Sequence, residues 1–496
     1  MDTSKTEQQA GKHSFNDQVE ADSFDLVIIG SGPGGYSTAL RSAQLGARVA
    51  LVERDSVVGG TCLNRGCIPT KALMTATSTI TASAHARELG IQSSFDGIDF
   101  AKLGAFRQAS VDAMTGGLSD LLQQRKVRLI HGEGRIAQDG LVEVTGSDGS
   151  SRKLHARNIV IATGARSMAL PNLAFSDDII DSDRALTLER FPQHPVIIGA
   201  GAVAVEFASI WQAAGSQVTL IIRKDRVLSG WDRRTGVTLT RELKKQGIRV
   251  ITGSQCTKVE GSQGKLSVSY SSLDDETGQT SESISADKVL VAIGRTPNTD
   301  SDWFKQVGID TDDHNLLVTD PWGRTSVKDI WALGDITPGY HFAHRAFEQG
   351  MVIAESIAGL KPSPVKEETI PQVVFSTPQA ACVGYTRQQA QAQEDLTQVE
   401  ETPYPMLANA RMRMSGSGGS LSVVTACEHS KPGERIVVGV HLVAPEAAEL
   451  IAEAEQIVGN RIPVSQAARL IHPHPTFSES LGEALLKADG RPLHMR

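Results

Sequence analysis

The sequence predicts an α/β protein with two domains built on βαβ units and a separate α+β module at the C-terminal end. Two glycine-rich turns, at 30–35 and 199–204, each follow an apolar run typical of a buried strand and precede a helical pattern. Pro362 and Pro364 mark the boundary before the last module. With 496 residues the chain is too long for one hydrophobic core, so several packed units are expected.

Each βαβ unit is expected as a strand, a glycine-rich turn, a helix and a second strand. In the first unit these elements fall at 24–30, 31–35, 36–45 and 48–53. In the second unit they fall at 195–199, 200–204, 205–214 and 217–222. A polar hairpin tip is expected at 145–152, further strands at 158–162 and 289–294, and a helical stretch up to about Gly359. One pattern used twice predicts two nucleotide-binding domains of the Rossmann-like type.

The composition of the chain changes at the points where these units begin and end. Residues 1–22 are polar and aperiodic, so we predict a disordered tail there. The domain boundaries predicted after it are 23–165 and 166–290 for the two nucleotide-binding domains, 291–365 for the return of the chain to the first domain, and 366–496 for the C-terminal module.

Composition and charge exclude several classes of partner. The formal net charge of −8 gives no electrostatic footprint for nucleic acid or an anionic membrane. No apolar run approaches the roughly 20 residues that cross a bilayer, and no secretory signal pattern opens the chain. We therefore expect a cytoplasmic protein. Five cysteines are too few for a disulfide scaffold, so a close pair indicates catalysis or metal binding.

The first glycine-rich turn has the spacing of a dinucleotide site. Gly30, Gly32 and Gly35 let the backbone turn tightly and approach a pyrophosphate, and the following helix N-terminus favours its charge. Glu53 ends the next strand, where its carboxylate can accept hydrogen bonds from ribose hydroxyls. A simple tight turn is the structural alternative, and the strand-turn-helix context disfavours it.

The second turn differs from the first in ways that bear on its nucleotide. Gly199 and Gly201 repeat the pattern, but Ala204 replaces the third glycine and Ile222 stands where a ribose-binding acid is expected. The cations that follow at once are Arg223, Lys224 and Arg226. Loss of the acid and gain of cations that could hold a 2′-phosphate favour NADP⁺ over NAD⁺. Alternatively, these cations only coat a solvated loop.

Cys62 and Cys67 form the one close cysteine pair. On a regular helix their Cα atoms would lie roughly 7 to 9 Å apart, beyond the 4.4–6.8 Å or so that a disulfide spans. The segment must therefore tighten, and Gly66 suits that distortion. An accessible disulfide near a helix N-terminus is the reducible, catalytic kind. A zinc site lacks two further ligands at recognisable spacing. The other cysteines, Cys256, Cys382 and Cys427, are expected to be small packed hydrophobes without a chemical role.

With these residues in view, the chain resembles the pyridine nucleotide-disulfide oxidoreductase family, and within it most closely the dihydrolipoamide dehydrogenases. The segment GTCLNRGCIPTKAL at 60–73 resembles the family's active-site signature, and residues 30–46 resemble its FAD fingerprint. Further similar segments are ATGARS from Ala162, AIGRTPNT from Ala292 and DIWALGDI from Asp329. The resemblance implies FAD contacts at Gly30, Gly32, Gly35, Glu53, Thr61, Lys71, Thr163, Gly164, Gly334, Asp335 and Ala343. It implies contacts to NAD⁺ or NADP⁺ at Gly199, Gly201, Ala204, Glu206, Arg223 and Gly294.

The segment HPHPTFSE at 472–479 resembles the family's base segment, which implies that His474 is the acid/base and that Glu479 orients it. A dithiol is a poor nucleophile until deprotonated, and an imidazole whose tautomer a carboxylate fixes is a usual acceptor for its proton. A structural turn is the alternative for a histidine between prolines. The resemblance also implies a cis bond before Pro475 and a pairing of Lys71 with Glu206.

The resemblance implies a homodimer joined through residues 366–496, with His474 acting on the cysteines of the other subunit. The activity implied is oxidation of dihydrolipoyl groups, through a redox-active disulfide and FAD, to reduce NAD(P)⁺. The partner would be a lipoyl-bearing protein of a 2-oxoacid dehydrogenase or glycine cleavage system. An NADPH-dependent reductase of a small glutathione-like disulfide is the nearest alternative, which Ala204, Ile222 and Arg223 favour. A non-enzymatic FAD-binding scaffold is a third, against which both cysteines and His474 argue.

Overall fold

The computed structural model describes residues 22–138, 140–274 and 281–495, and they form two compact units. The first unit combines the chain up to Pro69 with Gln108–Arg166 and Arg295–Val365. The second combines Thr70–Arg107, Ser167–Gly294 and Lys366–Arg496. All but the last residue of the predicted tail lies outside the described residues. The last one, Asp22, pairs with Arg152.

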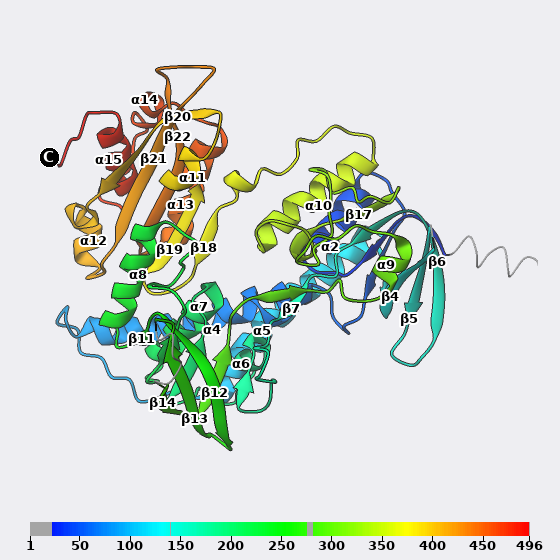
Figure 1. Ribbon diagram of the computed structural model, residues 1–496, viewed down its shortest axis with the longest axis horizontal. Coiled ribbons are helices and arrows are strands. Elements are labelled where there is room, and N and C mark those ends of the chain that lie inside the picture. Colours follow the sequence, from blue (N-terminus) through cyan, green and yellow to red (C-terminus); the bar gives the residue numbers. More distant parts are fainter. Residues whose placement is uncertain (1–21, 139, 275–280, 496) are drawn as a thin grey trace, which may run out of the picture. The chain divides into compact units, whose positions relative to one another are not determined.

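The first unit is built on a mixed sheet of seven strands (Figure 1). Its parallel strands are β3 (Arg128–His131), β2 (Val49–Glu53), β1 (Ser23–Ile29) and β6 (Ser151–Ile161), with β17 (Ile330–Ala332) also parallel to β6. The antiparallel strands β5 (Leu141–Thr145) and β4 (Glu133–Gln138) extend the sheet beyond β6. Strands β1 and β2 are apolar on both faces, as parallel strands covered from two sides require.

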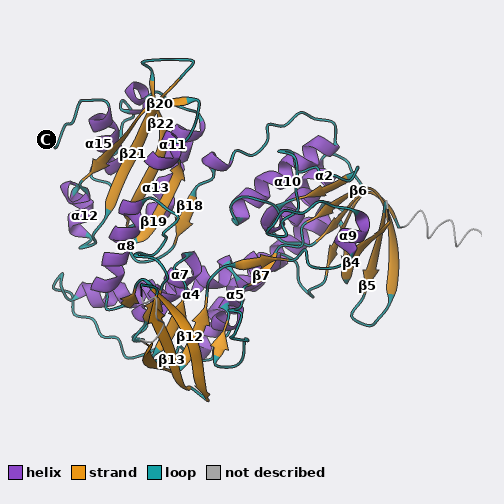
Figure 2. Cartoon of the chain, in the orientation of Figure 1, coloured by secondary structure: helices purple, strands orange, loops and turns teal. Residues whose placement is uncertain are grey.

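Two helices cover one face of this sheet, α2 (Pro33–Gln44) and α10 (Ala343–Ile357) (Figure 2). Leu26 and Ile28 of β1 pack in the same cluster as side chains of both helices. The two helices pack closely. A Cβ at Gly350 of α10 would overlap the Ser37 hydroxyl of α2, so only glycine fits there. Likewise a Cβ at Gly34 would overlap the Leu333 side chain. Small residues therefore set the position of α2, whose N-terminus carries the first glycine-rich turn.

The second unit repeats the βαβ plan in a five-stranded parallel sheet. Its strands, in spatial order, are β11 (Arg249–Ile251), β10 (Thr219–Ile221), β9 (Pro195–Ile198), β15 (Lys288–Val291) and β8 (Ile179–Ile180). Helix α7 (Ala202–Ala213) connects β9 to β10. A three-stranded antiparallel sheet adjoins it: β12 (Ser254–Ser262), β13 (Lys265–Ser272) and β14 (Ser281–Ala286). The sequence interpretation did not anticipate this small sheet.

The C-terminal part of the second unit is an antiparallel sheet with helices, as predicted. Its strands, in spatial order, are β18 (Gln372–Val374), β19 (Gln379–Gly384), β22 (Arg435–Ala444), β21 (Ser420–Glu428) and β20 (Leu396–Tyr404). Leu442 packs with side chains of α13 (Ala447–Gly459) and α15 (Glu479–Ala488). The next residue, Val443, packs with side chains of α8 (Arg233–Lys245). Because successive side chains of a strand point to opposite faces, the sheet is covered on both sides.

The remaining elements are short, apart from two long helices. They are α3 (Gly60–Arg65), α4 (Cys67–Ala86), α5 (Phe100–Gln124), α6 (Ser182–Leu186), α9 (Trp303–Val307), α11 (Arg387–Gln391), α12 (Ala410–Met414) and α14 (Val464–Ala467), the strand pair β7 (Ala165–Ser167) and β16 (Arg295–Pro297), and 3-10 turns at Gly334–Ile336, Glu367–Thr369 and Met406–Ala408. No described helix is both long and apolar enough to cross a membrane.

The predicted fold class is confirmed: two Rossmann-like sheets, one mixed and one parallel, and a C-terminal α+β module are present. Most element bounds differ from the predicted ones by up to three residues, but β6 begins at Ser151, seven residues before the predicted start at 158. Helix α2 begins at Pro33 and α7 at Ala202, because the third position of each motif belongs to the helix and not to the turn. Proline at the first helical position, with its fixed φ, suits that early start. The domain boundaries themselves stay predictions.

Candidate active site

Each glycine of the first motif has its own structural reason. Gly30 has a φ of +104°, and a Cβ there would overlap the Ala162 carbonyl oxygen at the end of β6. A Cβ at Gly35 would overlap the Gly30 carbonyl, so the third glycine lets the helix approach the strand. At Gly32 a Cβ would meet no atom within 4 Å. Gly32 caps α2 without a side-chain hydrogen bond, which leaves an open helix N-terminus that fits a pyrophosphate.

Glu53 ends β2 as a buried carboxylate that the turn itself holds in place. Its Oε2 accepts hydrogen bonds from the Ser31 amide at 2.9 Å and the Ser31 hydroxyl at 2.6 Å. Its Oε1 accepts one from the Asp55 amide at 2.8 Å. A carboxylate offers about four lone-pair sites. Glu53 therefore retains acceptor capacity for a ribose hydroxyl, so the residues of this turn fit an adenine dinucleotide such as FAD.

The other residues expected around FAD in the first unit lie where its strands and helices end. The Thr163 and Gly164 carbonyls each accept a 2.9 Å hydrogen bond from Asn298, which links β6 to the segment after β16. The Gly334 amide donates to Gln349 of α10 at 2.9 Å, and Asp335 lies 3.9 Å from Arg295. Ala343 begins α10, and Thr61 lies in α3. The structure thus places these residues and the first motif on one unit.

The second motif repeats the geometry of the first. Gly199 has a φ of +140°, and a Cβ there would overlap the Ala292 carbonyl oxygen after β15. Gly201 faces open space, while the Ala204 side chain is fully buried. Gly294, with a φ of +142°, follows the same strand end as Ala292. This second turn therefore also offers a helix N-terminus without a side-chain cap.

The strand end beside the second motif carries no acid. Ile222 is buried and supplies no acceptor for a ribose hydroxyl. Arg223 and Lys224 are exposed, and within the described part of the chain neither side chain forms an ion pair. Arg226 pairs with Asp225 at 2.8 Å and donates to the Ser229 carbonyl.

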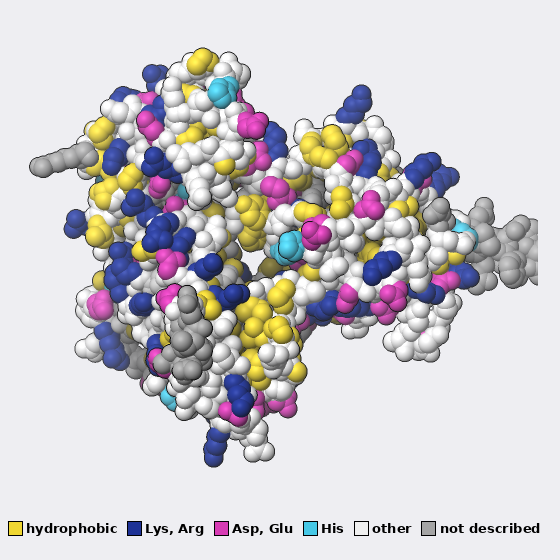
Figure 3. Space-filling view, viewed as in Figure 1, with side chains coloured by type: hydrophobic (Ala, Val, Ile, Leu, Met, Phe, Trp, Pro, Cys, Tyr) yellow, Lys and Arg dark blue, Asp and Glu magenta, His cyan; other side chains and the backbone are white. Residues whose placement is uncertain are grey.

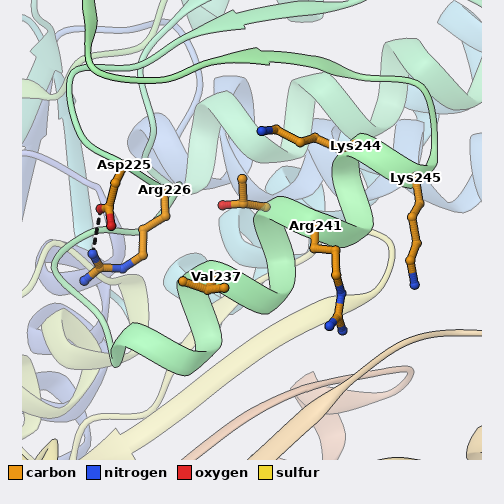
Figure 4. Close-up of a pocket in the computed structure, with 7 residues that line it drawn as sticks. Asp225, Arg226, Val237, Arg241, Lys244 and Lys245 are labelled. Carbon is orange, nitrogen blue, oxygen red and sulfur yellow. Dashed lines mark hydrogen bonds and ion pairs between the residues drawn. The ribbon is translucent and has the colours of Figure 1, made fainter.

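A basic pocket of about 490 Å³ opens beside this loop, along α8. Lys and Arg side chains gather on this part of the surface (Figure 3). The pocket is lined by Asp225, Arg226, Val237, Thr240, Arg241, Lys244 and Lys245. Lys244 points to one side of the helix, whereas Arg241 and Lys245 point to the other (Figure 4). Because the cations do not converge on one point, the pocket alone identifies no ligand.

The cysteine pair lies at a helix break. Cys62 is half-buried in α3, and Cys67 is exposed as the first residue of α4. Gly66 stands between the helices with φ −145° and ψ −108°, and a Cβ there would lie 2.9 Å from the Thr61 carbonyl oxygen. The chain therefore departs from a regular helix at Gly66, the residue that the sequence analysis names for such a distortion. No described cluster of three or more His, Cys, Asp or Glu side chains could hold a metal ion.

Tyr36 shares the surroundings of both cysteines, which the sequence interpretation missed. Burial, followed by negative charge on Cys62 and on Cys67, raises the pKa of its phenol to about 12. The Tyr36 ring also contacts Phe347 of α10, with ring centroids 5.5 Å apart. Tyr36 directly follows the third glycine of the first motif, and only that position could have drawn attention to it.

Lys71 and Glu206 form a pair in the second unit, as the resemblance implies. The Lys71 Nζ lies 3.1 and 3.0 Å from the two carboxylate oxygens of Glu206, which is buried in α7. Glu206 also accepts a 3.0 Å hydrogen bond from the Phe375 amide, and the ammonium lies 4.3 Å from the centre of the Phe375 ring. A buried carboxylate needs such partners. No sequence pattern pointed to Phe375, which is distant along the chain from both partners.

His474 and Glu479 form a hydrogen-bonded pair in the second unit. The His474 Nδ1 lies 2.7 Å from Glu479 Oε1, and the Thr476 amide donates to Oε2 at 2.7 Å. Burial acts to raise the pKa of Glu479, but the Thr476 amide, His474 and His472 outweigh it and lower that pKa. The His474–Pro475 bond is cis. The His474 side chain is 77% exposed, so it is accessible to a substrate or a second subunit.

Comparison with known protein families matches nearly the whole described chain. The model of pyridine nucleotide-disulfide oxidoreductases matches residues 24–350, and that of the family's dimerisation domain matches residues 370–485. Dihydrolipoyl dehydrogenase 3 of Pseudomonas putida is 39% identical over 95% of this chain and 100% of its own length. Dihydrolipoyl dehydrogenase of Geobacillus stearothermophilus is 37% identical over 95% of this chain and 97% of its own.

Solved structures agree with this assignment. LpdA of Mycobacterium tuberculosis superposes with a TM-score of 0.84 at 26% identity, over 93% of this chain and 99% of that one. The HOCl-induced flavoprotein disulfide reductase RclA of Escherichia coli gives a TM-score of 0.78 at 26% identity, with the same coverage. Two matched domain models, full-length relatives and the shared fold lead to one conclusion: this chain is a member of the pyridine nucleotide-disulfide oxidoreductase family, whose enzymes use FAD and a pyridine nucleotide.

Proposed function

We propose that the chain is an FAD-dependent dihydrolipoyl dehydrogenase that oxidises protein-bound dihydrolipoyl groups and reduces NAD(P)⁺. The observation that carries this proposal is the His474–Glu479 pair, at 2.7 Å, in a chain that also holds Cys62 and Cys67 at a helix start. A base for a thiol and an exchangeable cysteine pair are the two parts that dithiol oxidation requires. The relatives named dihydrolipoyl dehydrogenase, at 37% and 39% identity, support the substrate.

The hydrogen bonds of the pair define which nitrogen is the base. An ionised carboxylate can only accept, so Glu479 holds the proton of His474 on Nδ1. The neutral imidazole then presents Nε2 as its acceptor. Nε2 of His474 would remove a proton from the dihydrolipoyl thiol, and Glu479 would stabilise the resulting imidazolium.

The resulting thiolate attacks Sγ of Cys62, so the bond from Cys62 to Cys67 breaks and Cys67 leaves as a thiolate. The second dihydrolipoyl sulfur then displaces Cys62, closes the cyclic disulfide and leaves both cysteines reduced by two electrons. In the homodimer that the dimerisation domain supports, His474 of one subunit serves the cysteines of the other. Bound FAD would supply the two-electron relay from the reduced cysteines to the nicotinamide.

The chain's own residues would hold the two nucleotides at the two glycine turns. Gly30, Gly32 and Gly35 would lie against the FAD pyrophosphate, and Glu53 would bind its ribose. The other residues proposed to contact FAD are Thr61, Lys71, Thr163, Gly164, Gly334, Asp335 and Ala343. Those proposed to contact the pyridine nucleotide are Gly199, Gly201, Ala204, Glu206, Arg223 and Gly294.

We propose NADP⁺ as the preferred acceptor. The buried Ile222 offers no carboxylate to a 2′-hydroxyl, whereas the exposed Arg223 and Lys224 could pair with a 2′-phosphate. The partner would be the lipoyl-bearing protein of a 2-oxoacid dehydrogenase or glycine cleavage system in the cytoplasm. These same residues favour a second candidate, an NADPH-dependent reductase of a small disulfide, which would use the same cysteines in the opposite direction.

The test is reduction of NAD⁺ and of NADP⁺ by dihydrolipoamide, measured side by side on the purified FAD-loaded protein. Turnover with either nucleotide supports the dehydrogenase, and a higher kcat/KM with NADP⁺ supports the role of Arg223. No turnover with either, together with NADPH-dependent reduction of glutathione disulfide, would replace it by the second candidate. A Cys67→Ser control should keep FAD bound and lose turnover. Failure of both nucleotides to reduce the flavin would indicate a non-enzymatic protein.

A further inference from the structure

The 3-10 turn Gly334–Ile336 follows β17 and carries two residues proposed to contact FAD, Gly334 and Asp335. Gly334 has a φ of +76°, which favours glycine. Its carbonyl oxygen accepts hydrogen bonds from the amide and from the hydroxyl of Thr337, each at 2.9 Å. The turn packs against α10, where a Cβ built on Gly334 would meet the Cβ of Ala346 at 3.7 Å.

Two side chains of α10 hold the backbone groups of Gly334. Gln349 accepts a 2.9 Å hydrogen bond from the Gly334 amide. The Nη1 of Arg345 lies 3.4 Å from the Gly334 carbonyl oxygen and 3.4 Å from the Thr337 hydroxyl, and its Nη2 donates to the Pro338 carbonyl. Residues four apart lie on the same face of a helix. Arg345 and Gln349 thus form one clamp, which binds both the carbonyl and the amide of Gly334.

Burial makes the Arg345 side of this clamp rigid. Arg345 is only 3% exposed. A buried guanidinium is stable only where its N–H groups find acceptors, so a change in the position of the turn would leave donors of Arg345 unsatisfied. Gln349 is less deeply buried than Arg345. The turn and the first two turns of α10 are therefore held together as one piece.

Asp335 follows Gly334 directly, so its backbone position depends on the clamp. Its side chain is 27% exposed, and its Oδ2 lies 3.9 Å from the Nε of Arg295, beyond hydrogen-bond distance. The carboxylate therefore keeps lone pairs that can accept hydrogen bonds from hydroxyl groups of FAD. Rotation of the Gly334 peptide would turn these acceptors in another direction.

We propose that Arg345 and Gln349 are positioning residues for FAD: by holding the carbonyl and the amide of Gly334, they fix Asp335 in the orientation that accepts hydrogen bonds from the cofactor. This inference rests on the proposed function, in which Asp335 contacts FAD. The clamp acts through Asp335, and its contribution is preorganisation, because an acceptor already held in place loses little conformational freedom when FAD binds.

Loss of the clamp should speed the release of FAD. Gln349→Leu removes the acceptor of the Gly334 amide, and the net contribution of one hydrogen bond corresponds to a release about tenfold faster. Arg345→Met should have an effect of about the same size, because it removes the donors to the turn. Gln349→Glu keeps an acceptor oxygen at this position, so its release rate should stay within about twofold of the wild type.

The test measures FAD release from the holoenzyme. After strong dilution, protein-bound and free FAD are separated by ultrafiltration at successive times and quantified by absorbance. Arg41→Met is the matched control, because Arg41 also fastens α10, through Glu355 at 2.6 Å, but near the other end of the helix. Gln349→Leu is also combined with Asp335→Asn. If the clamp acts through Asp335, adding Gln349→Leu to Asp335→Asn should change the release rate by no more than about twofold.

The expected result is faster release in Gln349→Leu and Arg345→Met, with near wild-type release in Arg41→Met and Gln349→Glu. Equal release rates in Gln349→Leu and Arg41→Met would overturn the proposal. A full effect of Gln349→Leu in the Asp335→Asn background would overturn it too, because the clamp would then act on the fold and not on Asp335. Gln349→Leu decides if Arg345→Met fails to fold. FAD release requires no substrate, so absence of dihydrolipoamide oxidation would count against the proposed function alone.

Discussion

Removing the Lys71 charge alone from the Lys71–Glu206 pair should destabilise the protein more than removing both charges. Lys71→Met leaves the Glu206 carboxylate buried with the Phe375 amide as its remaining donor. Glu206→Gln keeps an acceptor for that amide and leaves Lys71, which is 34% exposed, in reach of water. The double variant leaves no charge at the site. The order of stability is therefore expected to be wild type, then the double variant, then Lys71→Met.

The size of each effect follows from the burial of the partner left behind. Breaking a buried pair costs about 3 to 5 kcal/mol, and the lower end applies here because the lysine is partly solvated. Replacing both Lys71 and Glu206 by uncharged residues should cost about 1 kcal/mol of unfolding free energy, because well-packed uncharged replacements of buried ion pairs change stability little. The second substitution should thus restore about 2 kcal/mol to Lys71→Met, a coupling typical of contacting residues.

Urea unfolding of the FAD-loaded protein, followed by tryptophan fluorescence, measures this order. The buried Trp211 lies in α7, the helix that carries Glu206, and packs against Phe207 at 5.3 Å between ring centroids. Midpoints are compared because a chain of several units does not unfold in two states. Repeating the series at two FAD concentrations separates lost stability from lost FAD affinity. A double variant with a midpoint at or below that of Lys71→Met would refute the reasoning.

Three further outcomes are expected. Glu479→Gln should lower kcat/KM for dihydrolipoamide by about 10- to 100-fold in steady-state kinetics. The reason is that an amide holds the Nδ1–H tautomer of His474 less firmly than a carboxylate and does not stabilise its imidazolium. An unchanged kcat/KM would show that the pair has no role. Arg223→Leu should raise the KM for NADP⁺ about tenfold and leave that for NAD⁺ unchanged, and equal changes for both would count against a 2′-phosphate contact. Burial lowers the pKa of His441, despite its bond to the Tyr385 carbonyl. The unfolded chain therefore binds a proton at His441 more readily than the folded chain does, so the free energy of unfolding should fall as pH drops below about 6.5. Unfolding midpoints measured across this pH range should fall less steeply in His441→Gln than in the wild type.

The sequence could predict those features that depend on neighbours along the chain. Gly30 and Gly199 each required a strand before them and a helix after them, and both turns formed as expected. A distortion at Gly66 was expected from the spacing of Cys62 and Cys67, the reach of a disulfide and the glycine itself, and the helix is interrupted there. Periodicity and spacing act over a few residues, which is why these local features were within reach.

Features that depend on distant contacts could not be predicted. His472 is the first residue of a recognisable segment, but its ion-pair partner Glu453 lies 19 residues earlier, on another helix. The anchor of Glu206 is the Phe375 amide, 169 residues away. On the middle strand of the sheet formed by β12 to β14, Leu266, Val268 and Tyr270 alternate with more exposed residues and are buried. This alternation is weak in the sequence because many serines surround these apolar residues.

The two glycine turns are equivalent in backbone structure, so the difference between their nucleotides must come from side chains. The Gly30 amide bonds to the Val52 carbonyl, and the Gly199 amide bonds to that of Ile221, in each case one residue before the strand-ending position. The Ser31 carbonyl accepts a hydrogen bond from the Gly59 amide, and the Ala200 carbonyl accepts one from the Leu228 amide. Gly59 and Leu228 lie six residues after Glu53 and Ile222. Glu53 and Ile222 therefore occupy the same place.

The buried carboxylate of Glu53 depends on a donor that the second turn lacks. The Ser31 hydroxyl bonds to Glu53 at 2.6 Å, but its equivalent, Ala200, has no hydroxyl. A single Ile222→Glu change would bury a carboxylate with backbone donors alone, and leaving a buried charge short of partners is costly. Conversion of the second turn to NAD⁺ recognition would therefore require Ala200→Ser as well as an acid at Ile222. The absence of an acid at Ile222 is thus built into the turn together with Ala200, so the proposed preference for NADP⁺ depends on side chains at the strand end and not on the glycines.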